Sequence, residues 1–260
     1  MSLRRGVGFE RSEAGELRVC ELSTGTVLAR HAGDGGGDGA FSPDGNSVLV
    51  PGAPDALWEW QRDAWLALPV KVGPNPVLGP GELLAVTAGQ REVSVSNART
   101  GEIVRSLSIE AKGNVGTQPL AFAPDGGYLV VGGTFAARGL TLATGDAADL
   151  GENVLAAAVG SNGVVALATA GGIEFRKTSD GALLGSLTTP ALRRGKSATD
   201  ARDADALWRN ARGEIEVVGS RAPWLASLPC RVGDTSVPAE LCFDVLERAG
   251  VAREIATGGR

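Results

Sequence analysis

Short runs of apolar residues alternate with tight-turn signals along most of the chain. Ala40-Phe41-Ser42-Pro43-Asp44-Gly45 precedes the apolar residues 48–50, and Ala121-Phe122-Ala123-Pro124-Asp125-Gly126 precedes the apolar residues 128–131. In a Pro-Asp-Gly turn the proline presets φ, the aspartate bonds the backbone and the glycine takes a positive φ. The flanking apolar residues therefore predict two short strands joined by a hairpin turn. Two near copies predict a chain that is built from repeats.

A second turn signal keeps the same spacing. It is a two-residue turn between apolar-rich segments, which is typical of a β-hairpin. An apolar anchor before the first hairpin of each unit also recurs, at intervals of roughly 36 to 48 residues, which is typical of propeller blades. The anchors are Phe41, Leu78, Phe122, Val159 and Leu207, and the two-residue turns are Thr24-Gly25, Thr100-Gly101, Thr144-Gly145 and Asp180-Gly181, with Arg62-Asp63 as a degraded copy.

Each repeat predicts four short antiparallel strands, so the predicted fold class is an all-β propeller of four-stranded blades. A single sheet of small residues cannot bury both faces, whereas blades stacked around an axis can. We expect six blades, and five or seven remain open. Complete blades are predicted for residues 40–70, 74–109, 116–150 and 153–187, three strands for residues 4–30, and an incomplete or irregular blade for residues 203–235.

These motifs give the chain a resemblance to WD40-type β-propellers over about residues 5–235. The turns at 41–45 and 122–126 are the specific part. The family ends its third strand with Trp-Asp, and Trp58-Glu59 is the one pair here that comes close. The family's Gly-His pair is missing, because His31 is the only histidine. The resemblance implies a degenerate WD40-like propeller, with propellers of the quinoprotein or lactonase kind as the alternative.

The C-terminal tail has a different pattern. Between Pro238 and Arg248 the residues 241, 242, 245 and 246 are apolar, which predicts a short amphipathic helix that ends at Gly250. We therefore expect a propeller over residues 1–235 and a helical tail over residues 236–260, packed on the propeller or on a partner.

The charge balance limits the choice of partners. The formal net charge is -5, with 25 basic and 30 acidic residues, which argues against a nucleic-acid-binding surface. No apolar run is long enough to cross a bilayer, and the N-terminus has no apolar region of the kind that a secretory signal needs. The three cysteines do not form a disulfide framework. We expect a cytoplasmic protein that binds neither membrane nor nucleic acid, and the oligomeric state is left open.

Reactive side chains are scarce. One histidine excludes His-pair metal sites, and His31 precedes the glycine-rich stretch 32–39, a flexible connection on which a catalytic base is poorly placed. That stretch occurs once and has no phosphate-loop lysine, and the acidic stretch 200–205 lacks the spacing of a calcium loop. The sequence therefore predicts no catalytic residue, no metal and no cofactor.

Trp58, Trp60 and Trp65 form the main aromatic cluster. Trp58 and Trp60 share a strand face by the period of two, so they pack between blades or form a contact patch for a protein partner. Trp224 is a weaker candidate for the same role. The predicted function is a non-catalytic protein–protein interaction scaffold with Trp58, Trp60, Trp65 and Trp224 as partner-binding residues. The alternatives are a propeller enzyme of the lactonase or quinoprotein type and a small-ligand or calcium-binding sensor.

Overall fold

The computed structural model describes most of the chain, and all structural statements below concern the described residues. These are residues 7–12, 15–32, 40–52, 54–72, 75–88, 92–108, 118–132, 136–188, 206–218, 230–232, 235–237 and 249–258. Contacts divide the chain into two units, residues 1–147 and 148–260, and each is described by itself. The boundary predicted between residues 235 and 236 stays a prediction.

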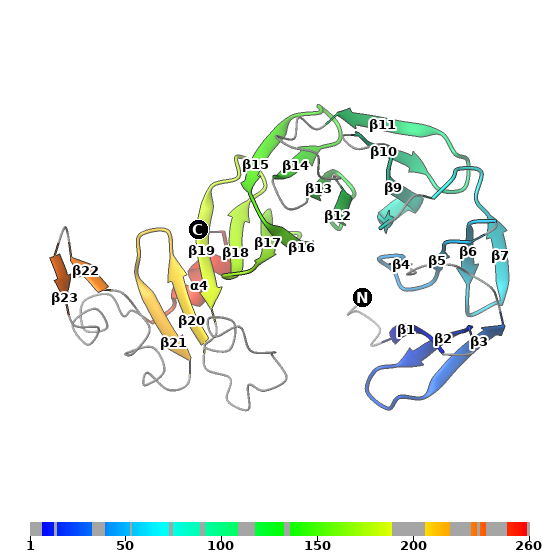
Figure 1. Ribbon diagram of the computed structural model, residues 1–260, viewed down its shortest axis with the longest axis horizontal. Coiled ribbons are helices and arrows are strands. Elements are labelled where there is room, and N and C mark those ends of the chain that lie inside the picture. Colours follow the sequence, from blue (N-terminus) through cyan, green and yellow to red (C-terminus); the bar gives the residue numbers. More distant parts are fainter. Residues whose placement is uncertain are drawn as a thin grey trace. The chain divides into compact units, whose positions relative to one another are not determined.

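Unit 1 consists of antiparallel sheets in which each strand pairs with its neighbour in the sequence (Figure 1). The first sheet has three strands, β1 (Val7–Arg11), β2 (Glu16–Glu21) and β3 (Val27–Ala32). The second has β4 (Ala40–Phe41), β5 (Val48–Val50), β6 (Ala56–Glu59) and β7 (Ala64–Ala67). The third has β8 (Val77–Leu78), the short 3-10 helix η1 (Pro80–Glu82), β9 (Leu83–Thr87), β10 (Glu92–Asn97) and β11 (Ile103–Ser108). The fourth has β12 (Gln118–Phe122), β13 (Tyr128–Gly132), β14 (Ala137–Thr141) and β15 (Ala147–Gly151), of which β15 crosses the unit boundary.

The Pro-Asp-Gly turns are confirmed. Gly45 and Gly126 have φ values of 71° and 76°, which L-residues with a side chain rarely adopt. The Asp44 carboxylate accepts a hydrogen bond from the Asn46 backbone N–H at 3.0 Å, and the Asp125 carboxylate accepts one from Gly127 at 2.9 Å. Each turn joins the first two strands of a four-stranded sheet, as the sequence predicts.

The sheets of unit 1 pack face to face through apolar side chains. Val48, Val50 and Trp58 of the second sheet meet Val7 and Leu17 of the first. Equivalent apolar clusters join the second sheet to the third and the third to the fourth. β13 is buried at every position, whereas β2 alternates between buried and half-buried residues, because only one face of the first sheet carries this core.

Unit 2 is built on a six-stranded sheet. Its strands, in spatial order, are β16 (Val154–Val159), β17 (Val164–Thr169), β18 (Gly172–Lys177), β19 (Leu183–Thr188), β20 (Ala206–Asn210) and β21 (Ile215–Val218). A separate hairpin is formed by β22 (Cys230–Val232) and β23 (Thr235–Val237).

The prediction that residues 203–235 begin a further blade is wrong for residues 206–218. β20 pairs antiparallel with β19, so this hairpin extends the preceding sheet. The glycine at position 185 of β19 lets β20 approach closely. A Cβ atom at this position would lie 2.3 Å from the backbone oxygen of Arg209. The absent side chain leaves room for the β20 backbone.

A short helix lies at the C-terminus, α4 (Val251–Ala256). It begins after Gly250, the residue at which the sequence pattern ends its helix, and the predicted stretch 238–248 lies outside the described residues. Val251 and Ile255 are one turn apart and buried, and α4 contacts β20 and β21. No helix among the described residues is long and apolar enough to span a bilayer.

Candidate functional site

The turn between β6 and β7 carries the main aromatic cluster. Trp58 on β6 and Trp65 on β7 are directly opposite in the strand register, and their rings stack with centroids 5.6 Å apart and planes 14° apart. Asp63 takes a left-handed backbone conformation with φ of 48°, which aspartate tolerates better than most residues. This bend places its carboxylate where it accepts a hydrogen bond from the Trp58 indole N–H at 3.0 Å.

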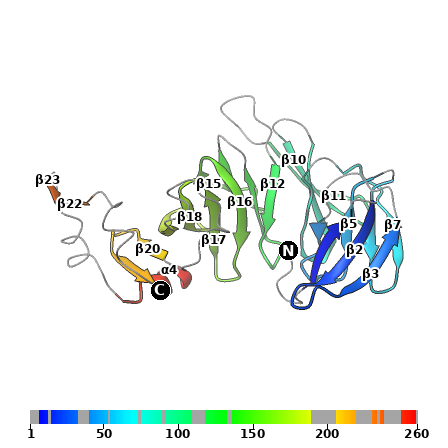
Figure 2. The same cartoon turned by 60° about the horizontal axis from the view of Figure 1, so that its bottom comes forward.

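His31 reaches this cluster from the first sheet. β3 and β7 lie side by side (Figure 2), and the centroid of the His31 ring is 4.2 Å from that of Trp65 and 5.9 Å from that of Trp58. The His31 Nδ1 atom lies 3.8 Å from the Asp63 Oδ1 atom. One imidazole, two indoles and one carboxylate thus form a single packed group, named the tryptophan cluster below.

His31 precedes the glycine-rich stretch in the sequence, and the structure places it within a strand. His31 lies on β3, opposite Leu17 of β2. Its side chain faces the second sheet together with Val27 and Ala29, and these three residues are the less exposed half of the alternating strand. That period of two is visible in the sequence and is the signal that identifies His31 as a strand residue. Its contacts with two indole rings and a carboxylate fix the imidazole in place.

The three tryptophans differ sharply in exposure. Trp58 has no exposed surface, whereas 38% of Trp65 is exposed. Trp60 follows β6, is half-buried, and donates its indole N–H to the backbone oxygen of Gly45 at 2.9 Å. The structure therefore places Trp58 in the core between two sheets, Trp60 against the Pro-Asp-Gly turn, and Trp65 at the surface. Trp224 lies outside the described residues.

Charged residues lie in the turn between β6 and β7 and on the face of β6 opposite to Trp58. Glu59 at the end of β6 accepts a hydrogen bond from Arg99 at 2.8 Å, and Arg99 also bonds Glu82. These hydrogen bonds, that to Glu59 first, raise the pKa of Arg99 above its usual range. The side chains of Arg62 and Asp63, in the turn between β6 and β7, are largely exposed. Asp63 thus brings a carboxylate to the cluster itself, and Arg62 adds an exposed positive charge in the same turn.

A second aromatic pair lies in unit 2. Phe175 on β18 and Trp208 on β20 stack with centroids 5.4 Å apart, and both are half-buried. The sequence pattern does not indicate this pair, because it assigns residues 172–177 and 206–210 to different blades. The sequence signal for this arrangement is the absence of charged residues in β19, because an uncharged edge strand can pair with a further strand.

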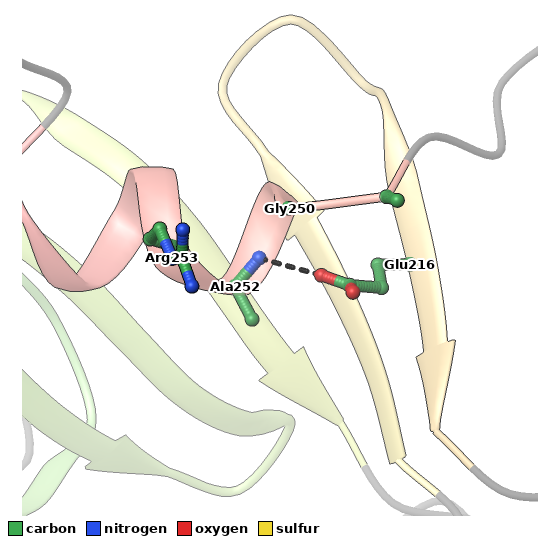
Figure 3. Close-up of a pocket in the computed structure, with 5 residues that line it drawn as sticks. Glu216, Gly250, Ala252 and Arg253 are labelled. Atoms are coloured by element: carbon green, nitrogen blue, oxygen red, sulfur yellow. Dashed lines mark hydrogen bonds between the residues drawn. The ribbon is translucent and has the colours of Figure 1, made fainter.

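A shallow cavity of about 480 Å³ lies at the start of α4 (Figure 3). Glu216 and Arg253 line it with Ala249, Gly250 and Ala252. The Glu216 carboxylate accepts a hydrogen bond from the Ala252 backbone N–H at 2.9 Å, so it caps the helix. Among the described residues, no group of three His, Cys, Asp or Glu side chains is placed to hold a metal ion. The stretches 33–39 and 200–205 lie outside the described residues.

Comparison with known proteins supports the fold. No model of a protein family matches the chain, and no curated protein matches it. Among solved structures, TolB from Acinetobacter baumannii, a β-propeller protein, superposes with a TM-score of 0.50 at 20% sequence identity. The match covers 68% of this chain and 49% of TolB, so the chain spans about half the length of TolB. The fold is propeller-like.

The propeller-like fold does not by itself assign a function. Solved chains that match this one number 890, and at 20% identity the likeness to TolB concerns the fold alone. Folds of this kind carry many unrelated functions, and side chains at specific sites determine which function a chain has.

Proposed function

We propose that this chain is a non-catalytic protein-binding scaffold on a WD40-like propeller, and that Trp65 is the centre of its contact surface. The observation that carries the proposal is the exposure of Trp65 beside a fully buried Trp58. Tryptophan is strongly enriched among the residues that dominate binding energy at protein interfaces.

The surroundings of Trp65 favour binding because they hold the indole in one orientation. Trp58 stacks on it, His31 lies against it, and Asp63 ties Trp58 in place. A side chain that is already ordered loses little conformational entropy when a partner binds, so more of the contact energy contributes to affinity. In this proposal Trp58 holds Trp65 from the core side, Trp60 packs against the same buried cluster as Trp58, and the role of Trp224 stays a prediction.

The WD40-like assignment rests on two local positions. The Phe41-Ser42-Pro43-Asp44-Gly45 turn joins the first and second strands of its sheet, and Trp58-Glu59 are the last two residues of the third strand. Both positions are those at which the WD40 pattern carries its turn and its Trp-Asp pair. Five sheets of three or more strands are present among the described residues, which favours the five-blade alternative over six.

The test compares proteins that are retained by the immobilised full chain and by two variants. Trp65→Ala removes the exposed indole, and Leu28→Ala is the matched control, because Leu28 is 46% exposed on the outer strand β3. We expect at least one protein from the native cell lysate to be retained by the wild type and by Leu28→Ala, and to be lost with Trp65→Ala. Identical retention by all three, or retention by none, contradicts the proposal.

A further inference from the structure

The outer strands of the sheets differ in charge. Here the outer strand is the fourth of each four-strand repeat, or the third of the first sheet. β3 carries Arg30 and His31, β11 carries Arg105, and β15 carries Asp149, whereas β7 and β19 carry no charged residue. Charged residues on an edge strand are a common protection against pairing with another strand. β7 and β19 lack this protection.

One of these two uncharged edges is already occupied. β20 of the same chain pairs with β19 over four positions, from Gly185 opposite Asn210 to Thr188 opposite Leu207. The chain therefore contains its own example of strand addition at the outer edge of a sheet. β7 is four residues long, which equals the number of positions over which β20 pairs with β19. It is the last strand of its sheet.

The hydrogen-bond pattern shows which backbone groups β7 presents at its free edge. The Leu68 N–H bonds the Asp55 oxygen at 2.8 Å, and the register then pairs Ala67 with Ala56 and Trp65 with Trp58. In an antiparallel ladder, hydrogen-bonded and non-hydrogen-bonded pairs alternate. The N–H and C=O groups of Trp65 and Ala67 therefore point away from β6, and they have no backbone partner among the described residues.

We propose that β7 accepts an extended segment of a partner protein by antiparallel strand addition, paired with the Trp65 and Ala67 backbone, with an apolar partner side chain against the exposed Trp65 ring. This inference rests on the proposed function and specifies the class of partner for the same surface. Backbone pairing supplies affinity for any extended segment, and the Trp65 ring selects segments with an apolar residue at the matching position.

The test uses random dodecapeptides displayed on phage, selected on the immobilised full chain and counter-selected on Trp65→Ala. The tightest peptide is then synthesised with a single N-methyl group at each position in turn. We expect methylation at every second residue to weaken binding about tenfold, because it removes one backbone hydrogen bond, and methylation at the intervening residues to have little effect. Amide exchange at Trp65 and Ala67 slows when this peptide binds.

Two variants check the edge directly. Ala67→Arg places on β7 the kind of charge that β3 and β11 carry, and Ala67 is exposed, so folding is preserved. We expect it to weaken peptide binding about tenfold or more, whereas Ser108→Arg, which is also exposed and lies at the end of β11, leaves the affinity unchanged.

The outcomes separate the two proposals. Peptides that need Trp65 but show no alternation on methylation overturn strand addition and leave Trp65 as a side-chain contact. Absence of any peptide that distinguishes the wild type from Trp65→Ala overturns strand addition and counts against peptide recognition by Trp65. The lysate comparison described under the proposed function tests independently whether Trp65 binds a protein partner.

Discussion

The hydroxyl of Tyr128 is the buried side-chain polar atom that lacks a hydrogen-bond partner among the described residues. Tyr128 lies on β13 and its hydroxyl lies over Gly139 of the neighbouring strand, where a side chain would collide with it. Burial raises the pKa of Tyr128 to about 12 from an ordinary value of 10.0. An unpartnered buried hydroxyl costs about 1–3 kcal/mol, so this residue opposes folding through its polar atom and favours it through its ring.

This pKa shift predicts a loss of stability at alkaline pH. Between pH 10.0 and about 12 the unfolded chain ionises its tyrosine and the folded chain does not, so the folded state becomes less stable as pH rises through that window. Because the chain has one tyrosine, the absorbance of the ionised phenol reports Tyr128 alone. We expect a titration midpoint near 12 in the folded protein and near 10.0 in urea.

Tyr128→Phe is the matched variant for this titration. It removes the hydroxyl and keeps the ring, so the absorbance change disappears, and the free energy of unfolding at neutral pH equals that of the wild type or exceeds it by about 1 kcal/mol. Equal midpoints for the folded and urea-unfolded wild type contradict the assignment.

At the scale of the elements, the hairpins with strong turn chemistry could be predicted from the sequence. The Pro-Asp-Gly turns fix local backbone angles, so the strands on either side of Gly45 and Gly126 form where the pattern places them. The uncharged sequence of β19 indicates an open edge, but it does not by itself predict the pairing with β20, because β7 is also uncharged and the choice depends on which sheet edge is free in space. For the same reason the sequence identifies Trp58 and Trp65 as a cluster but does not bring His31 to it from another sheet.

The fit of β20 against β19 depends on Gly185, and this gives a prediction for Gly185→Ala. The added Cβ atom would meet the Arg209 backbone oxygen and the Ile255 side chain, so β20 and α4 have to move away. Overpacking of this kind costs about 1–3 kcal/mol. We expect amide exchange over residues 206–218 to accelerate about tenfold or more, while β17 and β18 keep their protection.

Gly171→Ala is the control for Gly185→Ala. Gly171 lies in the turn between β17 and β18, and the nearest side-chain atom would be 3.8 Å from its added Cβ, which is ordinary contact. Its exchange pattern should match that of the wild type. Unchanged protection of residues 206–218 in Gly185→Ala would show that β20 does not need the space at Gly185.

For the whole molecule, local repeats specify each sheet more firmly than they specify the number of sheets. The last repeat has the same turn signals as the others, yet its sheet gains two strands from the segment that follows. Blade number depends on such edge pairings, which lie outside the repeat pattern. The exposure of Trp65 likewise depends on how the first and second sheets pack against each other. The sequence motif around Trp65 does not determine it.

One alternative to the scaffold is that the full chain is a calcium sensor. Measuring Tm with and without calcium distinguishes this alternative from the scaffold. The acidic stretch 200–205 is the sequence feature closest to a calcium loop, and it lacks the turn glycine and the ligand spacing that such a loop requires. A calcium site present at about ten times its Kd would stabilise the folded state by about 1.4 kcal/mol and raise Tm by about 2–4 °C. We expect a shift below about 1 °C between millimolar calcium and chelator, because without a site the ion adds no binding free energy to the folded state. A rise of the larger size, reversed by chelator and absent with magnesium, would favour the calcium sensor over the scaffold.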